Sequence, residues 1–195
     1  MDKKDEKREV LLNAAMEVLL KYGPRKATLE DIASKADMAT TSLYYYFKNK
    51  KDIIVATAER EIQRIIEDID LSQQQTENRS LEKRLAAIWQ ASFQHPIKCK
   101  FDLDDFLEII QYTREMIPKM LKHQNDTVRR LLEEGLQSGQ LQIDDLDLAT
   151  TTVSFAMRGM GQALIEGEDR SVIERALTKL SRLLIRGMQQ PIEQQ

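Results

Sequence analysis

The sequence has little cysteine, glycine or proline. A single cysteine among 195 residues leaves no partner for an internal disulfide and too few thiolates for a zinc or iron–sulfur cage. The seven glycines and four prolines are about half the usual share of these two residues. These shortages exclude disulfide scaffolds and metal ribbons, and they favour long helices with few turns.

Long hydrophobic runs and an apolar leader are also missing. The longest stretch without a charged residue runs from Leu85 to Ile97, which is shorter than the roughly 20 mainly apolar residues that span a bilayer. The first nine residues are almost all charged, so the sequence begins without a secretory h-region. We expect a cytoplasmic protein that has no membrane partner.

Charged residues are abundant, at 31% of the chain, and their signs are unevenly distributed. The net charge of the whole chain is −3, which argues against a protein coated in nucleic acid. Through Asp52, however, basic residues outnumber acidic ones by 11 to 9. This small asymmetry fits a DNA-contacting head on an acidic body, and it fits a chance fluctuation about equally well.

Apolar residues recur at helical spacing almost everywhere, and no segment is convincing as a strand. The Gln-rich stretch Ser72–Asn78 interrupts this periodicity and is predicted to be a loop or linker. We therefore expect an all-α protein of about nine helices, divided into a three-helix head at residues 1–50 and a helical body at 51–195. The expected helices occupy roughly residues 10–22, 28–36, 38–47, 50–69, 80–95, 102–116, 118–139, 147–167 and 171–188.

The pair of short helices at 28–47 has the form of a helix-turn-helix. Thr28 with Asp31 three residues later predicts a capping box at the start of the first helix. Asp37 falls in the turn, where Asp tolerates a left-handed φ angle better than most residues. Leu43 and Phe47 would hold the second helix to the core. The outer face of that helix would then carry hydroxyl-bearing side chains: Thr40, Thr41, Ser42, Tyr44, Tyr45 and Tyr46.

Such a hydroxyl-rich face suits DNA. A recognition helix presents its N-terminal residues to base edges in the major groove, which is about 12 Å wide, and hydroxyl groups bond to bases and phosphates alike. Lys48, Lys50 and Lys51 follow at the start of the next helix, where lysines and helix amides attract phosphate oxygens. Tyr44 and Tyr46 have an alternative role, because they could pack against the core of the head.

The run TLEDIASKADMATTSLYYYFKNKKDII resembles the DNA-binding signature of the TetR family of bacterial ligand-responsive transcriptional regulators, most specifically at Leu-Tyr-x-Tyr-Phe-x-x-Lys, residues 43–50. The resemblance implies a DNA-binding domain at residues 1–50 and a ligand-binding and dimerisation domain at 51–195. It also implies a homodimer that represses transcription at a near-palindromic double-stranded DNA operator until a small-molecule effector binds. The implied contacts are with phosphates from Thr28, Tyr44, Tyr46 and Lys50, and with bases or nearby backbone from Thr40, Thr41, Ser42 and Tyr45.

Three residues depart from the pattern of the family. Asp37 and Thr41 stand where the family usually has glycine, and Ala39 replaces the serine that would cap the recognition helix. Loss of that cap costs about 1 kcal/mol unless Thr40 or Thr41 takes over in a helix with a shifted start. The operator preference of the family therefore does not transfer to this chain.

Aromatic and methionine side chains of the body are candidates for an effector cavity, because the family's central helices form one. Such residues are also common in plain cores, since methionine fills irregular gaps. Their apolar character favours a hydrophobic or acyl-type effector. The candidates are Trp89, Phe93, Phe106, Ile110, Met116, Phe155 and Met157.

The last two predicted helices carry more apolar positions than one buried face of each helix needs. In the resembled family the same surface of a second subunit covers them and forms a four-helix interface. Burial against the rest of the same chain is the alternative for any one residue. The candidates for dimerisation are Phe155, Met160, Leu164, Leu177, Leu180 and Leu184.

Patterns for catalysis or for a resident cofactor are missing. The sequence has no Ser-His-Asp order, Gly-rich phosphate loop or metal-ligand spacing, and neither histidine follows a glutamate by three residues, as a di-iron helical bundle requires. We expect no enzymatic activity, no cofactor and no metal. The alternative function is that of a helical lipid or small-molecule binding protein that has lost DNA binding.

Overall fold

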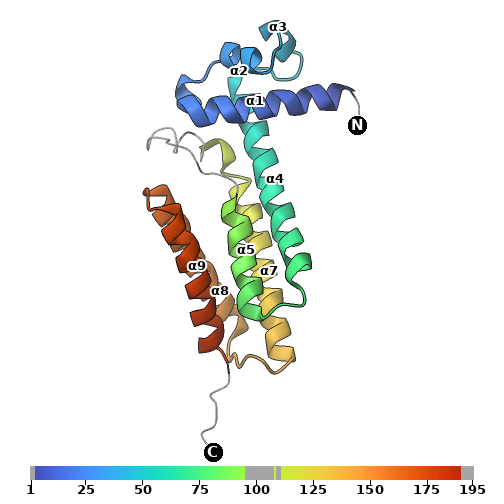
Figure 1. The fold of residues 1–195 in the computed structure, drawn as a ribbon. Coiled ribbons are helices and arrows are strands. Elements are labelled where there is room, and N and C mark those ends of the chain that lie inside the picture. The colour runs from blue at the N-terminus through green and yellow to red at the C-terminus, as the bar shows by residue number, and fades with distance from the viewer. Residues whose placement is uncertain (1–2, 95–107, 109–110, 190–195) are drawn as a thin grey trace, which may run out of the picture. The chain divides into compact units, whose positions relative to one another are not determined.

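The computed structural model describes residues 3–94, 108 and 111–189. All regular secondary structure in those ranges is helical (Figure 1), which confirms the all-α prediction. The helix predicted near residues 102–116 lies mostly outside the described ranges, and no described helix is long and apolar enough to cross a bilayer. The helices are α1 (Lys3–Lys26), α2 (Leu29–Lys35), α3 (Thr40–Leu43), α4 (Lys50–Thr76), α5 (Leu81–Gln94), α7 (Ile117–Gln137), α8 (Leu146–Ile165) and α9 (Arg170–Gly187).

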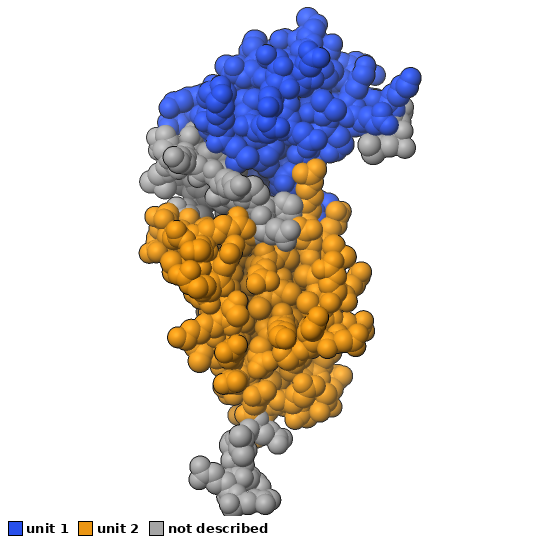
Figure 2. Space-filling model, in the orientation of Figure 1, with its two compact units in different colours: residues 1–63, 96–118 blue, residues 64–95, 119–195 orange. Residues whose placement is uncertain are grey.

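The chain divides into two compact units (Figure 2). Each unit has its own hydrophobic core. The first unit comprises residues 1–63 and 96–118, and the second comprises residues 64–95 and 119–195. The helix α4 contributes its beginning to the first unit and its end to the second.

The first unit is built on α1, α2, α3 and the beginning of α4. Gly23 has a φ angle of +79° and interrupts α1 just before Pro24, where the sequence predicts the helix to stop. Glycine suits this position because it lacks the Cβ atom that disfavours positive φ angles. The largest buried side chains of this core are Leu11, Leu12, Leu19, Ile32, Leu43, Phe47, Ile53 and Ile54.

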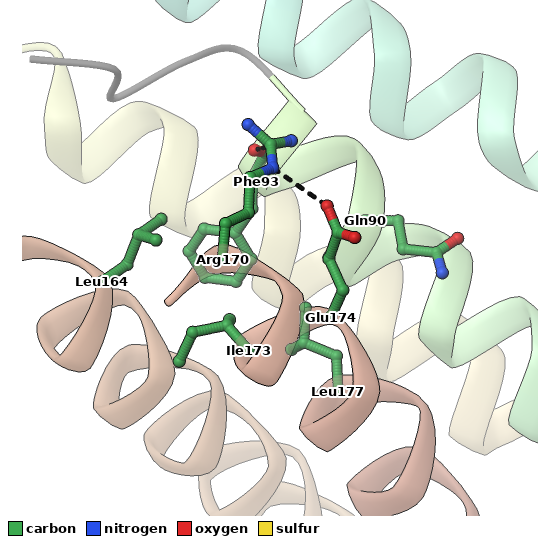
Figure 3. A pocket seen from close by; sticks show the side chains of 7 residues that line it. All are labelled: Gln90, Phe93, Leu164, Arg170, Ile173, Glu174 and Leu177. Carbon is green, nitrogen blue, oxygen red and sulfur yellow. Dashed lines mark hydrogen bonds and ion pairs between the residues drawn. The ribbon is translucent and has the colours of Figure 1, made fainter. Parts of the chain in front are cut away.

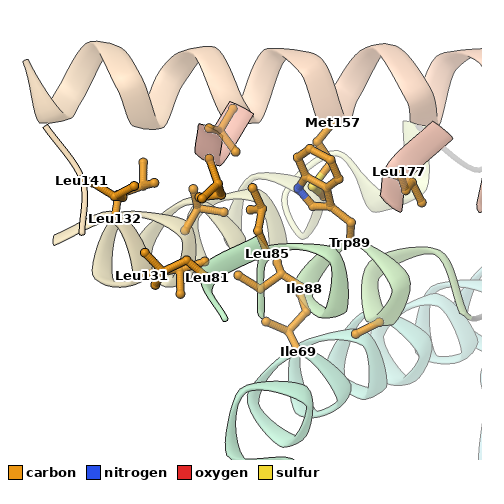
Figure 4. Packing of buried hydrophobic residues seen from close by; sticks show 14 of the residues in the cluster. Ile69, Leu81, Leu85, Ile88, Trp89, Leu131, Leu132, Leu141, Met157 and Leu177 are labelled. Carbon is orange, nitrogen blue, oxygen red and sulfur yellow. The ribbon is translucent and has the colours of Figure 1, made fainter. Parts of the chain in front are cut away.

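The second unit has a core centred on Trp89 of α5 (Figure 4). Trp89, Leu85 and Leu132 have no more than 1% of their surface exposed, and Met157 of α8 lies beside the indole ring. Each fully buried side chain of this size contributes about 1.5–3 kcal/mol through burial of apolar surface. The hydrophobic stabilisation of this unit therefore comes from side chains of α5, α7, α8 and α9, together with Ile69 at the end of α4 and Leu141 after α7.

Local sequence signals define the ends of the helices in the second unit. Gly139 follows α7 with a φ angle of +70°, as expected for a glycine just past a helix C-terminus. The Asp145 carboxylate accepts from the Leu148 amide at 2.9 Å, and the Asp169 carboxylate accepts from the Ser171 amide at 2.7 Å. These bonds satisfy amides that have no acceptor within their own helix.

The prediction of a loop at Ser72–Asn78 is wrong for most of this stretch, because α4 continues through Thr76. Side-chain hydroxyl groups bond back to the helix: Ser72 donates to the Ile69 carbonyl at 2.7 Å, and Thr76 donates to the Ser72 carbonyl at 2.6 Å. The side-chain amide of Gln73 also donates to the backbone carbonyl of Arg84 in α5 at 3.2 Å. The polar composition predicts a loop, but these polar side chains form hydrogen bonds with carbonyl groups of α4 and α5 while their backbone remains helical.

Candidate functional site

The first helix of the helix-turn-helix begins with the predicted capping box. The Asp31 amide donates to the Thr28 hydroxyl oxygen at 3.0 Å, and the Thr28 amide donates to the Asp31 carboxylate at 3.1 Å. The Thr28 hydroxyl also donates to that carboxylate at 2.6 Å. Thr28 therefore fixes the start of α2, and its exposed side chain remains near the helix terminus where a phosphate contact is predicted.

The turn between α2 and α3 has the strained residue that the sequence predicts. Asp37 has a φ angle of +54°, and it is the one described residue other than glycine with a positive φ angle. The chain then closes back on α2, because the Met38 amide donates to the Ala33 carbonyl at 2.9 Å. Ala33 is 1% exposed, so its small side chain allows the two short helices to approach closely.

The helix α3 starts without a side-chain cap. Ala39 is the N-cap residue and supplies no side-chain hydrogen bond, and the helix begins at Thr40, so neither threonine takes over the cap through a shifted start. The helix has four residues and continues as a turn, in which the Tyr46 and Phe47 amides donate to the Leu43 carbonyl at 2.9 and 3.0 Å. Tertiary packing must therefore hold this segment in place, since short isolated helices are unstable in water.

Buried and exposed residues alternate sharply along residues 40–47, which comprise α3 and the turn after it and are called the α3 segment below. Leu43 and Phe47 are 0% and 4% exposed, whereas Tyr44 and Tyr45 are 54% and 70% exposed. Tyr46 is half-buried against the core of the head, which is the packing role considered for it from the sequence. Thr41 and Ser42 are exposed and Thr40 is half-buried. The result is an exposed hydroxyl-rich surface on a fixed scaffold.

Lys50 has a partner that the sequence pattern does not indicate. Its ammonium donates to the Arg25 carbonyl at 2.9 Å and so connects the beginning of α4 to the end of α1. The Asn49 side chain caps α4 by accepting from the Asp52 amide at 2.9 Å. An ammonium has three N–H donors, so Lys50 retains donors for the predicted phosphate contact while it also stabilises the head.

Two basic residues of α1 also lie beside the α3 segment, and sequence reasoning missed both. The Lys4 ammonium is 5.2 Å from the centroid of the Tyr45 ring, and the Arg8 guanidinium is 5.5 Å from the centroid of the Phe47 ring. Tyr45 and Tyr46 meet edge to face, with centroids 5.0 Å apart and planes at 85°. The pairs are about forty positions apart in sequence, so no local motif could reveal them.

The candidate effector residues do not gather in one place. Trp89 and Met157 are buried in the core of the second unit, and Met116 is half-buried in the first unit. Phe155 is 62% exposed, with the Arg158 guanidinium 4.7 Å from its ring centroid, so it faces solvent within this protomer. Phe93 lines a pocket, whereas Phe106 and Ile110 lie outside the described residues.

The pocket at Phe93 lies between the end of α5 and the helices α8 and α9 (Figure 3). Its volume is about 270 Å³. At the rim, the Arg170 guanidinium donates to the Phe93 carbonyl at 3.1 Å and to the Glu174 carboxylate at 2.9 Å (Figure 3). The pocket therefore combines apolar walls with a cation whose side chain is 44% exposed. The lining residues are Gln90, Phe93, Leu164, Arg170, Ile173, Glu174 and Leu177.

The candidate dimerisation residues differ in their exposure. Leu177 is 1% exposed within the core of its own protomer, so it is unavailable to a second subunit. Helical periodicity cannot separate such a core position from an interface position, because both are apolar. Phe155 is exposed. The helices α8 and α9 also carry other large exposed apolar side chains, which the sequence patterns did not predict. Met160, Leu164, Leu180 and Leu184 are half-buried, and the additional exposed apolar residues are Leu148, Val172 and Leu183.

Hydrogen bonds shift the pKa values of Asp169 and Tyr112 in opposite directions. Hydrogen bonds from the Ser171 hydroxyl and amide stabilise the Asp169 carboxylate and lower its pKa. The Tyr112 hydroxyl donates to the Glu108 carboxylate at 2.9 Å, and this bond, with burial as a smaller cause, raises the pKa of Tyr112. Within the described ranges, no three His, Cys, Asp or Glu side chains gather in a group able to hold a metal ion.

Comparison with known proteins connects this geometry to gene regulation. Residues 11–57 match the sequence model of a family described as bacterial regulatory proteins, tetR family. The fatty acid metabolism regulator protein of Bacillus subtilis is 26% identical over 146 residues, which are 72% of this chain and 74% of the relative.

Solved structures share the fold. FadR, a transcriptional regulator from Bacillus subtilis in complex with stearoyl-CoA, has a TM-score of 0.65 at 20% identity, over 92% of this chain and 98% of that one. A TetR transcription regulator from Haloarcula marismortui has a TM-score of 0.73 at 16% identity, over 95% of this chain and 100% of that one. At these identities the structures establish a shared architecture, and the helix-turn-helix lies in the segment that matches the family.

Proposed function

Because this chain belongs to the tetR family of bacterial regulatory proteins, we propose that it is a dimeric repressor that leaves its DNA operator when a fatty-acyl effector binds. The family and the relatives are transcriptional regulators, in agreement with the prediction that the chain is not an enzyme. A regulator of this kind acts on the bacterial chromosome, so we place the protein in the cytoplasm.

The observation that carries the proposal is the exposed hydroxyl-rich surface of the α3 segment. Tyr45 is 70% exposed, although the neighbouring positions 43 and 47 are buried. Core packing therefore does not explain the exposed tyrosines and the adjacent Thr41 and Ser42. A short element held in this way fits a major groove, where hydroxyl groups can meet base edges and phosphates.

Dimerisation would supply the second recognition segment. Leu148 and Phe155 on α8 and Leu183 on α9 are each about 60% exposed, and exposed apolar surface of this kind favours a protein partner. Two-fold pairing through α8 and α9 would direct the two heads to successive major grooves, about 34 Å apart. The operator should accordingly be near-palindromic.

The pocket at Phe93 supports an effector with an apolar chain and an anionic end. Its volume of about 270 Å³ is near the lower limit for small-molecule sites, about 300 Å³, so it suits a segment of a chain rather than a bulky ring system. Arg170 at the rim would meet a carboxylate or phosphate. The names of the relatives, a fatty acid metabolism regulator and a regulator bound to stearoyl-CoA, support the same chemistry.

Effector binding would then oppose DNA binding. Linkage requires each ligand to weaken the other by the same coupling free energy, typically about 1–3 kcal/mol. The effector need only prefer a conformation of the dimer that fits the operator poorly. Release from DNA would follow from this preference, and no direct competition for one surface is required.

DNA binding is tested with Tyr45→Ala and Tyr22→Ala. Both tyrosines are exposed in the first unit, but Tyr22 is at the far end of α1 from Lys4 and Tyr45. We expect Tyr45→Ala to weaken binding to a duplex selected from a random library by at least about tenfold, the effect of losing one good contact. Tyr22→Ala should bind like the wild type. Equal affinity of both variants would contradict the assignment of the recognition surface.

The effector is tested with palmitoyl-coenzyme A, palmitate and free coenzyme A in an operator-release assay. We expect release by an acylated compound and none by coenzyme A alone. Arg170→Gln should raise the effector concentration needed for release about tenfold, the value of one charge-assisted hydrogen bond. Arg175→Gln is the matched control, because Arg175 is exposed on the same helix and does not line the pocket. Equal behaviour of the two variants would remove Arg170 from the proposed site.

The uncapped start of α3 is the observation that favours a second candidate function. Without a cap at Ala39, a helical carrier of lipids or other small molecules that no longer binds DNA is the second candidate. Acyl-ligand binding by a protein that shows no salt-sensitive DNA binding would favour this carrier over the repressor.

A further inference from the structure

The first turn of α1 holds two cations, Lys3 and Lys4, in an unexpected place. Lys4 is the second residue of this helix, where the macrodipole disfavours positive charge by about 0.3–1 kcal/mol. Asp5 and Glu6 in the same turn conform to the usual preference for acids. Lys4 is exposed, so burial of apolar surface does not explain its presence.

Charges on this part of α1 are separated by face. Glu9 and Asn13 accept hydrogen bonds from Arg60 of α4, at 3.2 and 3.0 Å. Lys4 and Arg8, one helical turn apart, instead lie over the Tyr45 and Phe47 rings. Glu9 and Asn13 are therefore directed to α4, whereas Lys4 and Arg8 are directed to the α3 segment.

The contact between Lys4 and Tyr45 leaves the ammonium able to bind a further group. A cation over an exposed aromatic ring gains only about 0.5–1 kcal/mol. The ring face is not a conventional hydrogen-bond acceptor, so the three N–H donors of the lysine ammonium remain able to bind one. Tyr45 is itself held edge to face against the half-buried Tyr46. The positive charge is thus kept within 5.2 Å of the centre of the most exposed ring on the recognition surface.

We propose that Lys4 is a DNA-contacting residue, whose ammonium binds a backbone phosphate beside the operator bases that Tyr45 approaches. This inference rests on the proposed DNA-binding function and extends the DNA interface from the helix-turn-helix to the first turn of α1. A phosphate accepts from an ammonium as a point charge, so the contact adds affinity without reading sequence.

The test compares Lys4→Met with Lys21→Met. Lys21 provides a close match, because it lies on the same helix with its ammonium 4.8 Å from the Tyr22 ring centroid. The two lysines are 17 positions apart, about 25 Å along the helix axis. Each substitution removes one positive charge and keeps an unbranched apolar side chain, and Lys4→Arg provides a charge-retaining variant at the proposed contact.

The measurement is the salt dependence of binding to the selected operator duplex and to a scrambled duplex of equal length. Log affinity falls as log salt rises, and each lost phosphate contact makes this slope less steep by about 0.9, so the slope for a dimer carrying Lys4→Met should be less steep by about 1.8. The loss of DNA affinity caused by Lys4→Met should then be about 12-fold smaller at about 200 mM salt than at about 50 mM salt. Lys21→Met and Lys4→Arg should retain the wild-type slope on both duplexes.

The outcomes separate this inference from the function on which it rests. If the wild type binds the operator and the salt slopes of Lys4→Met and Lys21→Met are equal, the role of Lys4 is overturned and the repressor proposal remains intact. A wild-type protein that binds neither duplex would overturn both. Because both lysines are exposed, we expect each variant to remain folded. Circular dichroism of each variant checks this.

Discussion

Replacing Arg60 with methionine should destabilise the first unit more than any exposed charge substitution in the same unit. Arg60 projects from α4, with its side chain only 11% exposed. Its guanidinium donates to the Glu9 carboxylate at 3.2 Å, to the Asn13 side chain at 3.0 Å and to the Leu12 carbonyl at 3.2 Å. It also pairs with Glu61 on its own helix at 2.9 Å. One side chain thus connects α4 to three residues of α1 that lie within about one helical turn of each other.

The magnitude follows from the three bonds between the helices. A hydrogen bond that involves a charged group contributes about 1.5–3 kcal/mol, but these bonds share one guanidinium, and the Glu9 side chain is 38% exposed. Discounting for this sharing and for solvent screening gives a loss of about 3 kcal/mol for Arg60→Met. Methionine retains an unbranched apolar side chain, so the loss reports mainly on the polar contacts.

Urea unfolding monitored by two signals is the appropriate assay. Far-ultraviolet circular dichroism reports on helices in both units, whereas fluorescence reports on the second unit, because Trp89 is the only tryptophan. Arg60→Met should lower the midpoint seen by circular dichroism. Lys35→Met is the control, since Lys35 pairs with Glu17 at 2.6 Å in the same unit but both side chains are about half exposed. A midpoint for Arg60→Met equal to that of the control would refute the reasoning.

Further predictions concern a helix cap and a close contact. The lowered pKa of Asp169 means that its stabilising contribution is present above its ordinary pKa of about 4 and is lost as pH falls through the folded value. The urea midpoints of the wild type and Asp169→Asn should therefore differ near pH 7 and converge in acid, and a constant gap would contradict this. A Cβ atom on Gly135 would lie 2.5 Å from Leu141 Cδ1 and 2.7 Å from Leu81 Cδ1, so Gly135→Ala should cost about 1–3 kcal/mol through overpacking. Gly187→Ala meets no atom within 4 Å and should leave Trp89 fluorescence unfolding unchanged; similar curves for both variants would disprove the packing argument.

The features that the sequence predicts correctly depend on local chemistry. The capping box at Thr28 and Asp31 joins residues three positions apart, and the left-handed turn at Asp37 reflects a conformational preference of one residue. The interruption of α1 at Gly23 and the end of α7 before Gly139 follow from the same short-range rules. Such signals are complete within one turn of chain, so sequence is sufficient to identify them.

The features that the sequence does not predict depend on contacts between distant residues. Lys50 bonds to a carbonyl 25 positions away, and Lys4 lies over Tyr45 from another helix. Periodicity predicts apolar faces on α8 and α9, but it does not distinguish Leu177, which is 1% exposed, from Phe155, which is 62% exposed. The prediction of a loop after Ile69 failed in part for the same reason, because the Gln73 side chain bonds to a carbonyl of α5.

The residues that hold the α3 segment in place are different from those that it presents. Leu43 and Phe47 anchor it, while Thr41, Ser42 and Tyr45 make little contribution to the core. Substitutions at the presented positions therefore cost the domain little folding free energy. If the α3 segment reads DNA as we propose, a descendant of a duplicated gene could acquire a new target sequence through single mutations at these positions with little loss of stability. This separation of anchoring from presentation makes the head readily adaptable during evolution.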